Sequence, residues 1–176
     1  MRRVALLRGV NLGGRKLLMT DLAACCEGLG WTGVRTLLAS GNVVFDSDLP
    51  SPAAEAVLET ALAGHGLATD VLVRDGAELA AVTTANPFDE AAADHPSHLL
   101  VTFHRELFPA EALVRLAAVH NGPERLHAVG RELFTDFGGR EQMRESMLVG
   151  AMRKARFPAI ATGRNWNTVT KLRDLL

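Results

Sequence analysis

Three polar clusters in this sequence combine the residue types that an anion-binding site needs. Each contains glycine, which lets another group approach the backbone closely, beside cationic or amide side chains that donate hydrogen bonds. They span residues 8–16, 40–42 and 162–168. Their candidate ligand-binding residues are Arg8, Asn11, Gly13, Gly14, Ser40, Gly41, Asn42, Arg164, Asn165, Trp166, Asn167 and Thr168. The combination predicts binding of a phosphate or carboxylate group.

The clusters contain no side chain that titrates near neutral pH, because they have no His, Cys, Asp or Glu. General acid–base catalysis normally needs such a group, and a serine nucleophile would need a base. The residue types therefore favour binding over catalysis, unless Asp46, Asp48 or Asp89 folds in from outside. A carboxylate or imidazole within hydrogen-bond reach of Arg8 and Arg164 would instead favour an enzyme, a transferase or hydrolase acting on a phosphorylated substrate.

The same clusters also have a purely structural interpretation. Ser, Thr and Asn side chains at turns hydrogen-bond to nearby backbone groups, and Asn165 is placed to cap the final helix. Trp166 suits either a core position or a platform for stacking. Under this alternative the clusters hold the two halves of the chain together, and Arg164 and Trp166 are buried and fully paired.

The elements that position the clusters follow a regular order. Residues 3–8 are apolar without alternation, which predicts a strand that is covered on both faces. Apolar periodicity and turn signals then predict a helix from Thr20 that ends before Gly30, strands over 34–39 and 43–45, a helix over 51–64 and a strand over 71–73. The order β-α-β-β-α-β is typical of a ferredoxin-like unit.

Near the end of the first half, Asp75 and Glu78 are spaced as a capping box for a short helix.

The pattern then repeats in the second half of the chain. The later elements are strands over 99–103, 126–129, 133–137 and 160–162, helices from Pro109 and over 141–153, and a last helix. The predicted fold is α+β, with two tandem ferredoxin-like (β-α-β-β-α-β) units and an extra C-terminal helix. The predicted halves are residues 1–85 and 98–176, joined by a connector at 86–97.

The composition is that of a globular protein. The 176 residues suffice for one domain or two small ones, and 48% apolar with 22% charged residues is ordinary. No apolar run approaches the ~18 residues of a membrane span, and the N-terminal run is too short for a signal peptide. The two cysteines, Cys25 and Cys26, are adjacent and more typical of helix packing than of a disulfide framework. These features predict a cytoplasmic protein.

A metal site is not favoured. Asp94, His95, His98 and His104 lie close in sequence, but they share no clear helix and no cysteine joins them. Catalytic zinc usually takes three protein ligands in a defined geometry. We therefore predict no metal and no cofactor, with the histidines solvated in the connector.

Nucleic acid is a weaker candidate partner than a small anion. A net charge of −1 provides no overall basic field. Ferredoxin-like sheets can bind RNA through exposed aromatic residues, for which this chain offers Phe45, Phe103, Phe134 and Phe137 and no tyrosine. The expected covering of the first strand on both faces argues against such a platform.

Several motifs are distinctive in combination: Leu6 to Gly14, Arg35-Thr36, Ser40 to Phe45, Asn86-Pro87-Phe88 and Ala161 to Val169. Together they resemble a bacterial family catalogued as a domain of unknown function, number 1697. The resemblance covers essentially the whole chain in order, and is weaker between residues 89 and 145. It implies two linked ferredoxin-like units and implies no activity, because the family has no established one.

The sequence as a whole predicts a cytoplasmic protein that binds a small anionic or phosphate-bearing ligand where the three clusters converge. Arg8 and Arg164 would supply charge, and the asparagines would supply oriented hydrogen bonds. The alternatives are an enzyme acting on a phosphorylated substrate and a module that binds nucleic acid or protein. The sequence predicts no membrane association, and it does not define an oligomeric state.

Overall fold

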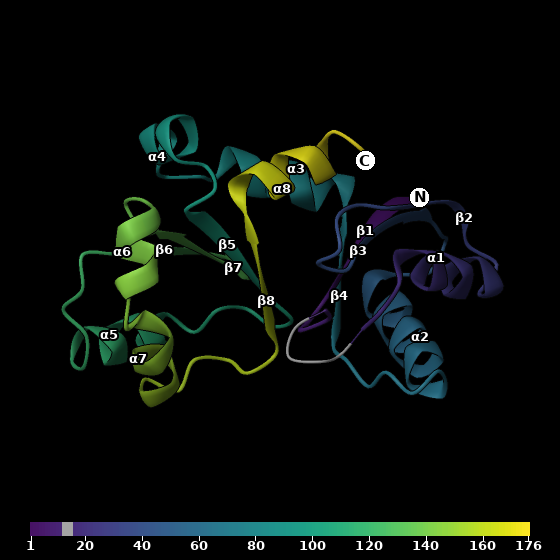
Figure 1. Cartoon of the computed structure of the whole chain (residues 1–176), viewed down its shortest axis with the longest axis horizontal. Helices are drawn as coiled ribbons and strands as arrows, with labels where there is room; N and C mark the ends of the chain where they lie inside the picture. The colour runs from purple at the N-terminus through teal and green to yellow at the C-terminus, as the bar shows by residue number, and fades with distance from the viewer. Residues whose placement is uncertain (12–15) are drawn as a thin grey trace. The chain divides into compact units, whose positions relative to one another are not determined.

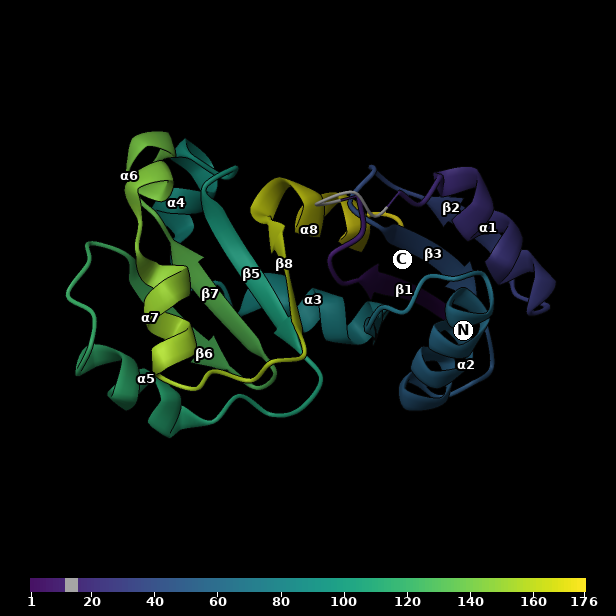
Figure 2. The ribbon, with the colours of Figure 1, turned by 60° about the horizontal axis from the view of Figure 1, so that its bottom comes forward.

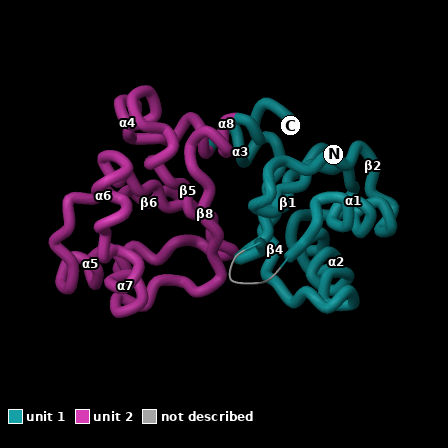
Figure 3. The backbone as a smooth tube through the Cα atoms, in the orientation of Figure 1, with its two compact units in different colours: residues 1–81, 171–176 teal, residues 82–170 magenta. Residues whose placement is uncertain are grey.

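The computed structural model describes residues 1–11 and 16–176 (Figure 1). The chain forms two compact units, Met1–Ala81 with Lys171–Leu176 and Val82–Thr170 (Figure 3). The boundaries fall within helices α3 (Gly76–Thr84) and α8 (Trp166–Arg173). The end of the chain thus differs from the predicted halves, which assigned all of residues 98–176 to the second. The C-terminal residues lie in the first unit, where Arg2 Nε donates a hydrogen bond of 3.2 Å to the carbonyl of Leu175.

The first unit is an antiparallel sheet in the order β2-β3-β1-β4, the strand order of a ferredoxin-like fold. Helices α1 and α2 contribute to one buried cluster on the same face of this sheet (Figure 2). Central strand β1 leads directly into the first polar cluster. The elements are β1 (Arg2–Leu7), α1 (Met19–Gly28), β2 (Thr32–Thr36), β3 (Asn42–Asp46), α2 (Ser51–Gly64) and β4 (Val71–Asp75).

The second unit repeats this topology, with the strand order β6-β7-β5-β8. In both units the fourth strand runs without a loop into a helix, α3 or α8. The predicted α+β fold of two tandem ferredoxin-like units with a C-terminal helix is therefore confirmed. The elements are α4 (Asp89–Asp94), β5 (Leu99–His104), α5 (Ala110–Ala117), β6 (Arg125–Val129), β7 (Glu132–Asp136), α6 (Arg140–Glu145), α7 (Leu148–Lys154) and β8 (Ala161–Asn165).

Some predicted elements have different limits in the structure. The helix predicted over 141–153 is two short helices, because Ser146 between them has extended backbone and its hydroxyl bonds to Glu124. Helix α1 begins at Met19, one residue before the predicted start at Thr20, and no side chain caps it. The connector contains a helix, α4. The last strand extends to Asn165, beyond the predicted 160–162.

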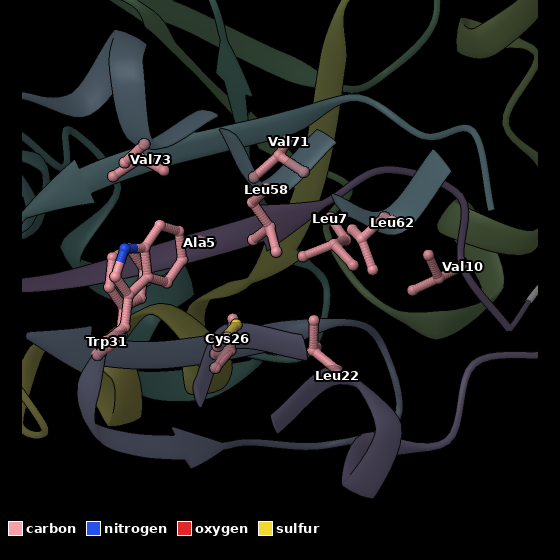
Figure 4. Close-up of a cluster of buried hydrophobic side chains, with 13 residues drawn as sticks. Ala5, Leu7, Val10, Leu22, Cys26, Trp31, Leu58, Leu62, Val71 and Val73 are labelled. Atoms are coloured by element: carbon pink, nitrogen blue, oxygen red, sulfur yellow. The ribbon is translucent and has the colours of Figure 1, made fainter. Parts of the chain in front are cut away.

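The core of the first unit surrounds β1. Residues Val4–Leu7 have no exposed surface, so both faces of this strand are covered, as predicted. On the helix side, Trp31 stacks on Phe45 with ring centroids 4.0 Å apart. Cys26 is fully buried beside Leu58 in the same cluster (Figure 4). The prediction that this cysteine is a packing residue is confirmed.

Edge strand β4 is protected by two glutamates of α2. Glu59 and Glu55, one helical turn apart, accept hydrogen bonds of 2.8 Å from the backbone N–H groups of Val71 and Val73. Occupied N–H groups cannot pair with a strand of another molecule, so these carboxylates shield the edge. The helix pattern alone does not predict this role, although a glutamate is an unusual residue to find on the buried side of a helix.

Candidate functional site

Asn11 in the first cluster holds its own loop together. Its Nδ2 donates to the carbonyls of Ala39 at 2.6 Å and Leu17 at 3.0 Å, and its Oδ1 accepts the N–H of Leu17 at 2.8 Å. Both amide hydrogens are thus engaged by the backbone. Gly13 and Gly14, two other predicted site residues, lie outside the described residues. The prediction of an anion site therefore depends on the remaining residues of this cluster.

The second cluster lies beside the first in the same unit. The amide of Asn42, which is fully buried, donates to the carbonyl of Leu37 at 2.7 Å and to Ser40 Oγ at 3.0 Å. The backbone N–H of Leu7 donates to the carbonyl of Gly41 at 2.8 Å. Two of the three clusters therefore meet, but the hydrogen bonds that join them run between groups of the chain itself.

Arg164 of the third cluster is buried on strand β8 rather than placed in a turn. Its Nη1 donates to Thr162 Oγ1 at 2.7 Å and to the carbonyl of Gly163 at 2.8 Å. Desolvation by burial lowers its pKa to about 10. Arg74 occupies the corresponding position of β4, is also buried, and donates to the carbonyl of Val73 at 3.0 Å. This repetition indicates a structural role for both arginines, which agrees with the burial of Arg164 expected under the structural alternative rather than with its predicted role in ligand binding.

Each of these arginines is followed by the capping residue of the next helix. Asn165 Oδ1 accepts hydrogen bonds from the backbone N–H of Thr168 at 3.0 Å and from its hydroxyl at 2.9 Å. In the first unit, Asp75 and Glu78 exchange two bonds of 2.9 Å between their carboxylates and backbone N–H groups. The predicted helix cap and the predicted capping box are both confirmed.

The rest of the third cluster binds the connector. The backbone N–H of Trp166 donates to the carbonyl of Pro96 at 3.1 Å, and Asn167 Nδ2 donates to Ser97 Oγ at 3.1 Å. The Trp166 side chain is half-buried. All of these groups belong to the second unit, whereas Arg8 belongs to the first. The structural interpretation of the 162–168 cluster accounts for most of its polar atoms.

Replacing Asn165 with alanine is expected to lower the free energy of unfolding by about 1 kcal/mol, because α8 loses the oxygen that caps it. Asn165→Asp keeps a capping oxygen and is expected to retain most of this stability. Urea denaturation followed by circular dichroism measures both variants. Equal losses for the alanine and aspartate variants would contradict a capping role.

Arg8, at the start of the first cluster, has its guanidinium at the surface. Its Nη1 lies 2.8 Å from Asp70 Oδ2, with 47% of the arginine side chain and 31% of the aspartate side chain exposed. The main chain beside it is fixed, because Arg8 N donates to the Asp70 carbonyl at 3.0 Å and Thr69 Oγ1 donates to the Arg8 carbonyl at 2.5 Å. The guanidinium therefore projects from an ordered backbone.

This ion pair borders a cleft of about 660 Å³ within the first unit. The cleft extends over the C-terminal half of α2 and the segment that precedes β4. Gly9, with a φ of +61°, lines it, and a Cβ atom added at Gly9 would meet no atom within 4 Å. The lining residues are Arg8, Gly9, Glu59, Ala63, Ala68, Thr69 and Asp70. A half-exposed guanidinium beside open backbone can bind an anionic group if that group replaces Asp70.

The connector histidines are not simply solvated. His95 Nε2 lies 2.8 Å from Asp136 Oδ1, which also accepts the N–H of Gly138 at 2.8 Å. Arg125 donates to Asp136 Oδ2 from Nε at 2.9 Å and from Nη2 at 2.6 Å. Among the residues that the structure describes, no group of three His, Cys, Asp or Glu side chains is arranged to hold a metal ion. No pattern in the sequence indicated that this network forms around Asp136.

The four phenylalanines considered for base stacking all lie in the core. Phe45, Phe103 and Phe134 have no exposed surface, and Phe137 is 8% exposed. Their rings are thus occupied by packing. In the described part of the chain, no helix has the length and apolar character needed to cross a membrane.

The strand order and the repeated arginine–cap junctions define the class: a duplicated α+β protein with a ferredoxin-like sheet in each unit. The chain matches the model of a family described as a protein of unknown function, DUF1697, over residues 1–134, and it belongs to that family. No curated protein matches it.

A solved structure of the same fold comes from Streptococcus pneumoniae. It is described as the conserved bacterial protein SP0830, with 21% sequence identity and a TM-score of 0.77. The match covers 99% of this chain and 97% of that one. At this identity the similarity shows a shared fold over the whole chain.

Proposed function

We propose that the chain binds a small anionic or phosphate-bearing ligand in the Arg8 cleft. The observation that supports this most directly is the ion pair of Arg8 with Asp70, whose atoms Nη1 and Oδ2 are 2.8 Å apart at the border of the cleft. A carboxylate of the chain itself occupies the position that a ligand anion would take. Exposed pairs of this kind contribute about 0.2–1 kcal/mol, so a ligand with several contacts can displace Asp70.

The proposed site is smaller than the one expected from the sequence. Asn11 and Asn42 are left out, because their amide hydrogens are bonded within the chain. Gly41 is left out because it is buried. Gly9 replaces it as the glycine at which a ligand can approach the backbone.

We also propose that this binding takes place in the cytoplasm. Both cysteines, Cys25 and Cys26, carry free thiols. Such thiols persist where glutathione and thioredoxin keep the compartment reducing. Phosphorylated metabolites are a source of suitable ligands there.

Arg8→Ala is expected to weaken binding of inorganic phosphate or a nucleotide by about tenfold or more, because the cation that pairs with the anion is lost. Asp70→Asn is expected to tighten the same binding by about two- to fivefold, because the competing carboxylate is removed. Isothermal titration calorimetry and thermal shift measure both effects.

Arg2 and Asp46 provide the matched control at the other end of β1. They form a partly exposed ion pair of 2.9 Å and line none of the clefts described in the first unit. Arg2→Ala and Asp46→Asn are expected to leave ligand affinity unchanged. The proposal fails if no anion stabilises the chain, or if the Arg8 and Arg2 variants bind alike.

An enzyme acting on a phosphorylated substrate is the second candidate. The observation in its favour is Asp70, a carboxylate within hydrogen-bond distance of Arg8. There, Asp70 would accept a proton from an attacking water. The Asp70→Asn variant separates the two functions. If the chain is a binding protein, the variant binds the anion more tightly than the wild type, and neither releases phosphate from a substrate. If the chain is an enzyme, the wild type releases phosphate from its substrate and the variant does not.

A further inference from the structure

A second cavity in the first unit, of about 620 Å³, lies between α1 and α2. Its apolar lining includes Leu29 at the end of α1 and Leu62 and Leu67 from α2 and the segment that follows it. This volume is in the range of small-molecule sites, which are mostly apolar with a few polar groups. The Arg8 cleft shares no lining residue with it, so the cavity is a separate site.

Three charged or polar side chains also line this cavity: Lys16, Asp21 and His65. All three are exposed. None of these side chains forms a hydrogen bond or ion pair with another residue in the described ranges. A cationic group and an anionic group are thus available beside one apolar surface.

We propose that this cavity binds a small zwitterion with a large apolar substituent, that is, an apolar amino acid. The Lys16 ammonium pairs with the ligand carboxylate, and the Asp21 carboxylate pairs with the ligand ammonium. The substituent lies on Leu29, Leu62 and Leu67, where it leaves water. A site with one charge of each sign favours a neutral zwitterion over an anion or a cation, because either ion leaves one protein charge without a partner.

Gly28 makes it possible to fill the cavity by substitution. It is the last residue of α1, it lines the cavity, and a Cβ atom added there would meet nothing within 4 Å. The first side-chain atom of a substituted residue therefore fits at this position without displacing neighbours, and a leucine here is expected to fill part of the cavity. Gly64, the last residue of α2, is equally open but does not line the cavity. Gly64→Leu is the matched control.

Cys25 provides a reporter inside the cavity. Its thiol lines the site and is half-buried, and burial raises its pKa, so it reacts slowly with thiol reagents at neutral pH. Burial raises the pKa of Cys26, which has no exposed surface, to about 12. Modification of the folded chain by a thiol reagent at alkaline pH therefore follows Cys25.

The test measures binding of L-leucine and L-phenylalanine to the full chain by calorimetry and by the rate of Cys25 modification. Saturating leucine is expected to slow modification at least about fivefold, and Gly28→Leu is expected to abolish calorimetric binding while Gly64→Leu retains it. Hexanoate and hexylamine, which each lack one charge, are expected to bind about tenfold more weakly or worse.

Three results would overturn this proposal: no binding of either amino acid, equal binding of hexanoate and leucine, or equal loss in the Gly28 and Gly64 variants. Arg8→Ala is expected to leave leucine binding unchanged, because Arg8 does not line this cavity. Failure of the Arg8 cleft to bind anions is thereby distinguished from failure of this site.

Discussion

Replacing Gly41 with alanine is expected to lower the free energy of unfolding by about 2–5 kcal/mol. The residue has a φ of +77°, a left-handed conformation that costs other residues about 1–2 kcal/mol. An added Cβ would collide with Val10 Cγ2 and lie 2.9 Å from Leu7 Cβ. Overpacking of this kind in a core typically costs about 1–3 kcal/mol more.

Gly9→Ala is the control that separates these two contributions. Gly9 has a φ of +61°, but no atom lies within 4 Å of the position that its Cβ would take. Its substitution is expected to cost only the conformational part, about 1–2 kcal/mol. Guanidinium denaturation followed by circular dichroism measures both variants. Equal losses of unfolding free energy in the two variants would mean that the close approach of Leu7 and Val10 to Gly41 adds nothing to the cost of a side chain there.

The role of Gly41 differs from the one expected from its sequence. A glycine between Ser40 and Asn42 predicts a turn where a ligand can approach the backbone. The close approach exists, but it is made by the side chains of Val10 in the first cluster and of Leu7 at the end of β1. Gly41 therefore fixes the position of the Arg8 loop against the β2–β3 hairpin, and acts on the candidate site only through that loop.

Asp136→Asn is expected to lower the free energy of unfolding at pH 7 by about 2–4 kcal/mol. The carboxylate side chain is 4% exposed and accepts hydrogen bonds from His95, Arg125 and Gly138. Asparagine retains one acceptor oxygen and turns an amide donor towards groups that also donate. A hydrogen bond to a charged group contributes about 1.5–3 kcal/mol, and Arg125, whose side chain is 48% exposed, keeps its ion pair with Glu90 in the variant.

The stability difference between wild type and Asp136→Asn is expected to depend on pH. Desolvation raises the pKa of Asp136, but the hydrogen bonds from Gly138, Arg125 and His95 outweigh it and lower the pKa overall. A carboxyl group whose folded-state pKa is lowered stabilises the fold above its unfolded-state pKa, about 3.9. This contribution is lost as the pH falls through the folded-state value. The difference is therefore expected to be constant between about pH 5 and 7 and to shrink below about pH 4.

Urea denaturation at pH 7, 5 and 3.5 measures this dependence. Asp46→Asn is the control, because Asp46 forms an ion pair with Arg2 but 40% of its side chain is exposed. An exposed pair is expected to contribute less than about 1 kcal/mol. A cost for Asp136→Asn that is no larger than for Asp46→Asn, or that does not change with pH, would show that the network around Asp136 contributes little to stability.

The sequence by itself determined the order of the elements and several of their ends. The apolar run Val4–Leu7 predicted a strand covered on both faces, and the spacing of Asp75 and Glu78 predicted a capping box that the structure contains. Asn165 caps α8 as predicted. These features depend on residues within one turn or one strand of each other, so their spacing in the sequence is nearly their spacing in space.

Only the tertiary structure decided what the polar clusters do. The partners of Arg8 and Asp136 include residues distant in sequence, Asp70 and His95, and nothing in the local pattern selects them. Burial made Arg164 a structural residue, whereas Arg8 is half-exposed at the border of a cleft. The physical reason is that a polar side chain can bind a ligand only through hydrogen-bond donors that the fold leaves free. Whether those donors are free depends on groups that the fold brings together from distant parts of the sequence.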